Sequence, residues 1–324
     1  MFDKIDRWVE RQIETVVRIN PWTNVYGLAR SLLALSTFLT FAFTDVHVLF
    51  KPALDIDQTP ICIGFAKHTS LFCLLQDHLG FAKILTLLIL VVVLSGWRPR
   101  ITGILQWWIC YSFVNSSLLV DGGDHVNMTL SSLLLPITLT DHRRWHWLTM
   151  EKEHPLTSRV QIRRMVALLS FFLIRIQVAV IYLHAAVAKC AVTEWQNGTA
   201  VYYWLTDPQY GVPEWLQPVV FPLLRVPFIV TAITWGSVAL EFALFAGLLA
   251  KKRYRIPLLW MGIIFHFGIA VMHGLISFSL SMIGALILFL RPLEDEFTFR
   301  IPLISGRLNN ESARNTRAQE ITRA

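Results

Sequence analysis

The chain has 324 residues, of which 54% are hydrophobic and 16% charged, and its mean hydropathy is +0.51. This composition excludes an ordinary soluble globular protein and indicates an all-α polytopic integral membrane protein. The net charge of +7 needs no nucleic-acid partner, because the basic residues gather between apolar segments, where they indicate membrane topology.

Residues 1–20 are expected to form an amphipathic helix on the inner surface of the membrane. Apolar side chains between Phe2 and Val17 recur at helical spacing on one side of this helix, and charges lie on the other. The first apolar segment follows without a small-residue cleavage site, so we expect no cleavable signal peptide.

Residues 21–292 are expected to form a transmembrane domain of about eight helices. The expected spans are Val25 to Thr44, Phe81 to Gly96, Ile101 to Val120, Val126 to Thr140, Met165 to Ala188, Phe228 to Ala250, Ile256 to Met272 and Gly274 to Leu290. Several are shorter than the ~20 residues of a perpendicular span, so they must draw in flanking residues or thin the bilayer locally. Residues 293–324 are expected to form a cytoplasmic tail, largely disordered after Leu303.

Basic residues orient these spans. Most of the 29 Lys and Arg residues fall in segments that share one side of an eight-span arrangement. The two long loops of the other side, Asp45 to Gly80 and Cys190 to Pro227, contain few. Because Lys and Arg prefer the cytoplasmic side, both termini are expected in the cytoplasm.

Lys189 stands alone at the end of the fifth expected span. An amine at the edge of hydrocarbon loses hydration, which disfavours its charged form and makes it a usable base. Arg175 and Tyr182 precede it at spacings of seven, so all three line one stripe, and Ala185 and Ala186 allow a neighbouring helix to approach closely. The alternative is a lysine that merely reaches to the interface.

Other polar residues are expected at the same outer depth. The sequence DGGDH from Asp121 to His125 forms the outer turn between spans three and four, and His266 and His273 lie in the outer half of span seven. With Lys189 they can share a pocket open to the outside. Each also has a structural interpretation: DGGD is a strong turn sequence, and His273 is best explained as an interfacial residue.

Three charged residues lie deeper and are expected to be structural. Arg30 and Arg175 need partners, and Glu241 in span six is the acidic residue at comparable depth. We therefore expect a buried Arg–Glu pair that holds the bundle together. A proton pathway is the alternative.

Cys62 and Cys73 lie in one outer loop and can form a structural disulfide if that compartment is oxidising. A redox-active pair is the alternative. The four cysteines include no CxxC and the histidines no HExxH, so no metal site is expected.

The segment with Tyr182, Ala185, Ala186, Lys189, Trp195 and Gly198 resembles the one that carries the base lysine in vitamin K-dependent gamma-carboxylase and its bacterial relatives, the horizontally transferred transmembrane (HTTM) group. Asp124 and His125 resemble a second functional site of that group, and His266 resembles the histidine of its late helix. The resemblance spans about residues 21–292.

The resemblance implies that Lys189 is a base for a reduced membrane quinone or another weak acid. It also implies that His125 orients the reacting oxygen, and that Tyr182, Asp124 and His266 complete the pocket. A membrane quinone is the cofactor that it implies. The chain lacks the large extramembrane domain of the carboxylase, so glutamate carboxylation is not implied.

Three strings, Thr23 to Leu35, Leu133 to Trp147 and Tyr202 to Gly211, are similar to the sporulation-delaying protein B family. That resemblance implies a subunit of the bacterial plasma membrane that works with a small partner protein to mature an exported, bacteriocin-like peptide toxin from its precursor. Two hypotheses remain open: an intramembrane enzyme or enzyme subunit, and a non-catalytic scaffold or export factor for the precursor.

Overall fold

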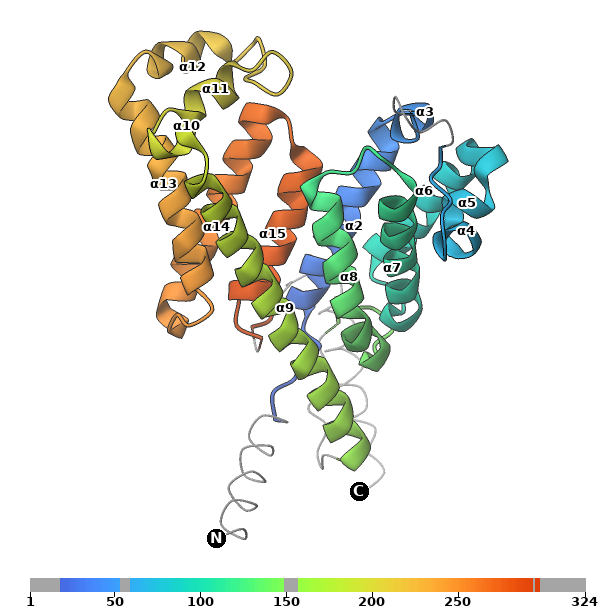
Figure 1. Ribbon diagram of the computed structural model, residues 1–324. Helices are drawn as coiled ribbons and strands as arrows, with labels where there is room; N and C mark the ends of the chain where they lie inside the picture. The colour runs from blue at the N-terminus through green and yellow to red at the C-terminus, as the bar shows by residue number, and fades with distance from the viewer. Residues whose placement is uncertain (1–17, 53–58, 149–156, 294, 298–324) are drawn as a thin grey trace, which may run out of the picture.

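The computed structural model describes residues 18–52, 59–148, 157–293 and 295–297. Most of the amphipathic helix expected over residues 1–20, and the whole tail after Leu303, lie outside the described residues. Within the described ranges the regular structure is helical (Figure 1), apart from one isolated bridge between Trp97 and Trp145.

Eight of the described helices have 15 residues or more. They are α2 (Asn24–Phe43), α6 (Leu79–Ser95), α7 (Pro99–Ser116), α8 (Gly122–Thr140), α9 (Ser158–Cys190), α13 (Pro227–Ala246), α14 (Lys252–His273) and α15 (Ile276–Leu290). Five helical segments, namely α2, α6 with the turn before it, α9, α13 and α14, are long and apolar enough to cross a membrane. The chain is thus a multi-pass membrane protein.

The helices α7 and α8 are less apolar because they carry buried polar side chains that other helices satisfy. The Gln106 amide, for example, accepts from Arg30 at 3.0 Å, and the Asn127 amide donates to the Leu33 carbonyl and the Thr37 hydroxyl at 3.2 and 3.0 Å. A hydropathy window counts such groups as if they faced lipid, although the bundle encloses them.

The helices α2 and α15 pack closely in the middle of the bundle (Figure 1). A Cβ added at Gly284 would lie 3.1 Å from the Ala29 carbonyl, and the Ser36 and Ser281 hydroxyls are 2.7 Å apart. Small residues therefore let the two backbones approach. In Figure 1, α6 and α7 lie on one side of this pair and α13 and α14 on the other, while α9 runs diagonally across the bundle.

Short helices occupy the two loops that the sequence predicted on the outer side. One loop holds α3 (Val46–Leu49), α4 (Ala66–Thr69), α5 (Leu71–Leu74) and the 3-10 helix η1 (Gln76–His78), and the other holds α10 (Thr193–Gln196), α11 (Ala200–Thr206) and α12 (Gln217–Leu224). Periodicity did not predict these helices, because most are one turn long.

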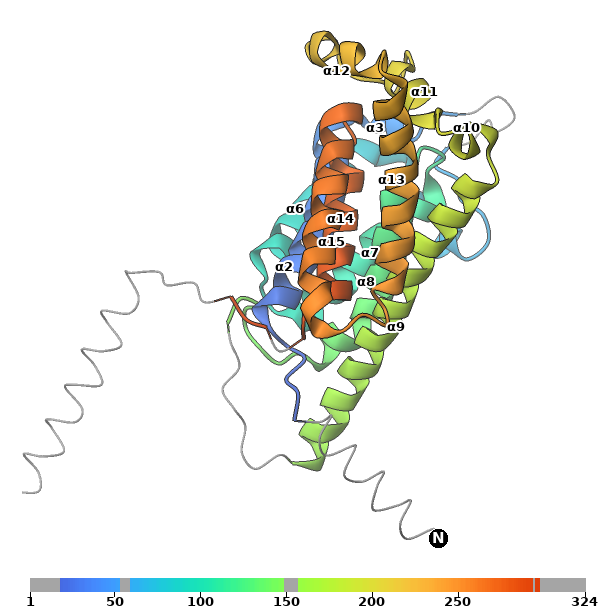
Figure 2. The ribbon, with the colours of Figure 1, turned by 90° about the vertical axis from the view of Figure 1, so that its left-hand side faces the viewer.

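Two long helices begin earlier than expected. The helix α8 starts at Gly122 instead of Val126, because Asp121 and Asp124 form a capping box: each carboxylate accepts from the other residue's backbone N–H, at 2.9 and 3.0 Å. The DGGD sequence is therefore a helix start. The helix α9 starts at Ser158, and its 33 residues span about 50 Å, so it projects past the other helices (Figure 2).

Candidate functional site

Lys189 lies in the last turn of α9, where its ammonium meets a carboxylate from α13. The Nζ atom donates to Glu241 Oε1 at 2.6 Å and to Oε2 at 2.8 Å. The Glu241 side chain is 6% exposed and that of Lys189 23%. A charge-assisted pair at these distances is short and strong, and it joins α9 to α13, where Glu241 is the acidic residue of an otherwise uncharged helix.

This pairing corrects the Arg–Glu pair expected from the sequence. Arg30 is fully buried, but its Nε donates to Gln106 at 3.0 Å and its Nη2 to Thr102 at 2.8 Å. Arg175 makes no ion pair within the described ranges. Glu241 is therefore the partner of Lys189, because both lie at the seam between α9 and α13.

Tyr182 of α9 forms a second polar contact, in this case with His266 of α14. The Tyr182 hydroxyl and His266 Nε2 are 2.9 Å apart, and both side chains are about 2% exposed. His266 Nδ1 is buried and has no hydrogen-bond partner among the described residues. Tyr182 and Lys189 lie seven residues apart on α9, so the two contacts lie on one stripe of that helix. We call Lys189, Glu241, Tyr182 and His266 the lysine site.

The loop after α9 covers the lysine ammonium. Lys189 Nζ lies 5.2 Å from the centre of the Trp195 ring, a cation–π contact, and the Trp235 indole N–H donates to the Trp195 carbonyl at 3.2 Å. Gly198 has a φ of +76°, and a Cβ there would lie 2.8 Å from Thr231. The glycine thus allows the loop to pack on α13.

A groove of about 340 Å³ lies beside the loop that follows α9. It is lined by Cys190, Trp195, Gln196, Trp235, Val238, Ala239 and Phe242. The lining side chains are mostly apolar and aromatic. Two of the lining residues lie next to Lys189: Cys190 follows it in the sequence, and the Trp195 ring covers its ammonium. An apolar molecule in this groove would lie next to the lysine.

The structure does not bring Asp124 and His125 to Lys189. His125 is exposed on the first turn of α8, and Asp124 is held in the capping box. Phe278 of α15 stands between: a Cβ on Gly123 would lie 2.8 Å from the Phe278 Cα, and the Phe278 ring is 5.7 Å from that of His266. In the described part of the chain, Asp124 bonds within its own capping box and the Lys189 ammonium bonds to Glu241, so a pocket shared by Asp124, His125 and Lys189 stays a prediction.

His273 also lies apart from the lysine site. Its Nδ1 is 2.6 Å from the Tyr210 carbonyl and must donate to it. The bond joins the end of α14 to the turn in the string Tyr202 to Gly211. In that turn the backbone N–H groups of Tyr210 and Gln209 hold the pKa of the Asp207 carboxyl below its usual range.

The other two distinctive strings meet at the opposite end of the bundle. Arg143 forms a buried ion pair with Asp141, with Nη2 and Oδ2 2.8 Å apart, and its Nη1 donates to the His146 and Leu148 carbonyls at 2.9 and 2.7 Å. The Tyr26 hydroxyl donates to Asp141 at 3.3 Å. These contacts clamp the loop after α8 onto α2.

The imidazole of His146 is enclosed by the same loop. Burial, followed by the positive charges of Arg30 and Arg143, lowers its pKa to about 2, so the ring is neutral. Arg30 Nη1 approaches His146 Nδ1 at 3.5 Å, and Ser31 Oγ lies 3.3 Å from Nε2. Because arginine only donates, Nε2 carries the proton. The polar side chains of Arg30 and His146 therefore bond to other residues of the protein.

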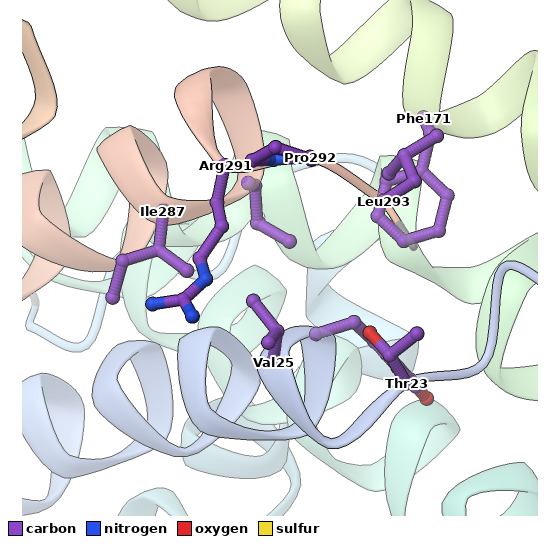
Figure 3. A pocket seen from close by; sticks show the side chains of 9 residues that line it. Thr23, Val25, Phe171, Ile287, Arg291, Pro292 and Leu293 are labelled. Carbon is purple, nitrogen blue, oxygen red and sulfur yellow. The ribbon is translucent and has the colours of Figure 1, made fainter. Parts of the chain in front are cut away.

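A small cavity near that end is lined mainly by apolar side chains, with Val25, Ile287 and Leu293 around it and Arg291 turned toward α2 (Figure 3). Its lining includes the hydroxyl residues Thr23 and Tyr26 but no Asp, Glu, His, Cys or Lys side chain. Among the described residues no group of three His, Cys, Asp or Glu side chains is placed to hold a metal ion. In the loop between α2 and α6 a disulfide joins Cys62 and Cys73.

The lysine site brings together an amine, a carboxylate, a phenol and an imidazole, which are residue types that general acid–base chemistry uses. An amine is a base only when neutral, and Glu241 is close enough to take its proton. Tyr182 and His266 can pass a second proton between them. Sequence reasoning missed Glu241 as a site residue. The available signal was a single carboxylate on an apolar helix.

Comparison with known proteins places the chain in a family. The HTTM domain matches residues 56–293. The uncharacterized protein YitO of Bacillus subtilis (strain 168) is 42% identical over 298 residues, covering 91% of each chain. Sporulation-delaying protein SdpB of the same organism is 38% identical over 300 residues, covering 91% of this chain and 88% of SdpB. No solved structure shows a significant match. The resemblance is confirmed: the chain belongs to the HTTM domain family.

Proposed function

We propose that the chain is a membrane subunit required to mature an exported peptide toxin, and that it acts through the lysine site. Its partners are the toxin precursor and a small protein of the same maturation system, and it works in the bacterial plasma membrane. The proposal rests on the similarity to SdpB over nearly the whole chain and on the chemistry of the site.

One observation carries the chemical part: Lys189, Glu241, Tyr182 and His266 form two short polar contacts inside an apolar seam. Charged groups in such surroundings are expensive and are commonly functional. Lys189 is the proposed base, Glu241 receives and returns its proton, and Tyr182 and His266 orient the reacting group.

A membrane quinone fits the groove beside Lys189, because the walls are apolar and include the Trp195 and Trp235 rings. In its reduced form a quinone supplies a weakly acidic hydroxyl. Trp195 and Trp235 would hold its ring, and Lys189 would lie at the edge of the groove. His125, which is exposed on the first turn of α8, remains a proposed catalytic residue on the basis of the family resemblance alone.

A scaffold or export factor is the second candidate. The Lys189–Glu241 contact also supports this candidate, because its two hydrogen bonds hold α9 against α13. On this hypothesis the lysine site holds the outer ends of the helices in place for a precursor that another protein processes.

The maturation proposal is tested by removing the chain from cells that make the toxin. We expect mature peptide to disappear from the medium and precursor or an intermediate to accumulate, as measured by mass spectrometry. Supplying the chain from a plasmid should restore the mature mass. Normal amounts of mature peptide without the chain would contradict both the enzyme and the scaffold hypotheses.

We further propose that the eight long helices all cross the membrane and that both termini are cytoplasmic. Support comes from the basic residues at the turn before α14 and from the few in the opposite loops. In a Cys190→Ser background, Glu214→Cys should react with a membrane-impermeant maleimide on intact cells. Arg253→Cys should react only after permeabilisation. The reverse pattern would invert the topology.

A further inference from the structure

The turn between α6 and α7 places two arginines side by side at one end of the bundle. The Arg98 backbone N–H donates to the Arg144 carbonyl at 2.8 Å, next to the isolated bridge that joins Trp97 to Trp145. Both arginine side chains are exposed. Like charges at neighbouring positions across such a bridge are unfavourable. An anion that contacts both guanidinium groups would offset this repulsion.

No carboxylate forms an ion pair with these arginines in the described part of the chain, where the paired carboxylates serve other cations. Asp141, which belongs to the same loop as Arg144, is fully buried and pairs with Arg143. A third arginine of the turn, Arg100, donates its Nη2 to His142. Its Nε is buried and has no hydrogen-bond partner among the described residues. The turn therefore offers guanidinium donors to a ligand.

The backbone of Arg98 indicates that its side chain is needed. Its φ is +36°, in the left-handed region that residues other than glycine adopt with strain. Glycine would adopt this conformation without that strain, so the shape of the turn does not require an arginine. Strained backbone of this kind clusters at ligand sites. The Arg98 guanidinium lies 5.8 Å from the centre of the Trp97 ring, and this cation–π contact holds it at the turn.

The turn lies where a membrane-spanning helix ends. The apolar segment that includes α6 is long enough to cross a membrane and ends at Ser95, directly before the turn. The Trp147 indole N–H donates to the Ser95 carbonyl at 2.9 Å, and tryptophans are typical of the boundary between lipid tails and headgroups. Arg98 and Arg144 are therefore at the depth of lipid headgroups.

Apolar side chains continue from the turn toward the middle of the membrane. Leu88 and Val91 are exposed on α6, and Ile104 is exposed on α7, which packs against α6. These residues precede the turn on α6 and follow it on α7, so they lie on the hydrocarbon side of the arginines. A phospholipid with its phosphate at the guanidinium groups would place its acyl chains along them. A soluble phosphate would gain nothing from this surface.

We propose that Arg98 and Arg144 bind the phosphate of an anionic phospholipid whose acyl chains lie along α6 and α7. Guanidinium groups bind phosphate through paired hydrogen bonds. The amino end of α7, an 18-residue helix without an acidic residue in its first turn, adds a partial positive charge. A headgroup with a net negative charge balances this set of charges, whereas a zwitterionic headgroup does not. The lipid joins the α6–α7 turn to the loop after α8.

The test uses the full chain, purified and stripped of lipid in a neutral detergent. Adding phosphatidylglycerol should raise the apparent Tm by about 4 °C, whereas phosphatidylcholine with the same acyl chains should not. The rise should be lost in Arg98→Gly and in Arg144→Gln. Arg159→Gln is the matched control, because Arg159 is an exposed arginine at the start of α9, and it should respond like the wild type.

The glycine variant keeps the result independent of folding. Glycine relieves the left-handed backbone at this position, so the Tm of Arg98→Gly in lipid-free detergent should equal or exceed that of the wild type. An equal rise with phosphatidylcholine would overturn the anionic headgroup. A rise with inorganic phosphate alone, lost in Arg98→Gly, would overturn the lipid as the occupant. Equal responses of Arg98→Gly and Arg159→Gln to phosphatidylglycerol would overturn the site itself.

Discussion

Replacing Lys189 with arginine should abolish mature toxin while leaving the protein folded and in the membrane. Arginine keeps the positive charge, can donate two hydrogen bonds to Glu241 and can stack on Trp195, so the structural contacts of Lys189 survive. It cannot lose its proton at accessible pH. General acid–base catalysis contributes about 10²–10⁴-fold, so secreted mature peptide should fall at least about a hundredfold.

The measurement is mass spectrometry of the medium at matched membrane levels of each variant. Lys83→Arg is the control, because Lys83 also sits at the end of a long helix but donates to the Thr44 carbonyl at 2.9 Å and lies away from the lysine site. Lys189→Ala should lose peptide under either hypothesis. If Lys189→Arg secretes as much mature peptide as the wild type, Lys189 is not a catalytic base, and the scaffold hypothesis remains.

The stripe on α9 could be predicted from sequence because it depends on local geometry alone. Residues spaced by seven lie on one face of a helix, and the structure sets Tyr182 and Lys189 against the α13–α14 hairpin. The small Ala185 and Ala186 were expected to permit this approach, and Ala186 is fully buried. A periodic pattern contains that information before any fold is known.

Partners across helices could not be predicted in this way. Glu241 and the two deep arginines were matched by depth, but depth ignores which helices are neighbours. The structure gives Arg30 the uncharged partners Gln106 and Thr102, because α7 packs near α2 and α13 does not. His125 was placed with Lys189 by the same reasoning from depth.

The strings Thr23 to Leu35 and Leu133 to Trp147 identified relatives without revealing their role. The structure explains why their residues occur together: Arg143 and Asp141 form a clamp that needs Tyr26 on the facing helix. Such long-range complementarity leaves no periodic trace. The residues of these two strings that form the clamp are therefore structural, and the proposed chemistry rests on residues at the opposite end of the bundle.

Among the substitutions considered, we expect one that breaks the Asp141–Arg143 pair to lower the stability of the protein most. In Asp141→Ala the Arg143 guanidinium stays buried without its carboxylate, which costs about 3–5 kcal/mol and should lower the apparent Tm in detergent by about 10 °C. Asp295→Ala breaks the exposed pair with Arg291, whose side chains are 34% and 26% exposed, and should change stability by less than about 1 kcal/mol.

The double variant Asp141→Ala with Arg143→Met distinguishes the cost of an unpaired buried charge from the loss of the ion pair itself. Removing both charges should recover part of the lost stability, because an apolar side chain of similar length carries no desolvation cost. Intrinsic fluorescence of the 12 tryptophans reports unfolding in all of these proteins. If Asp141→Ala melts at the temperature of Asp295→Ala, the loop after α8 is not what holds α2 and α8 together, and the two distinctive strings must serve another purpose.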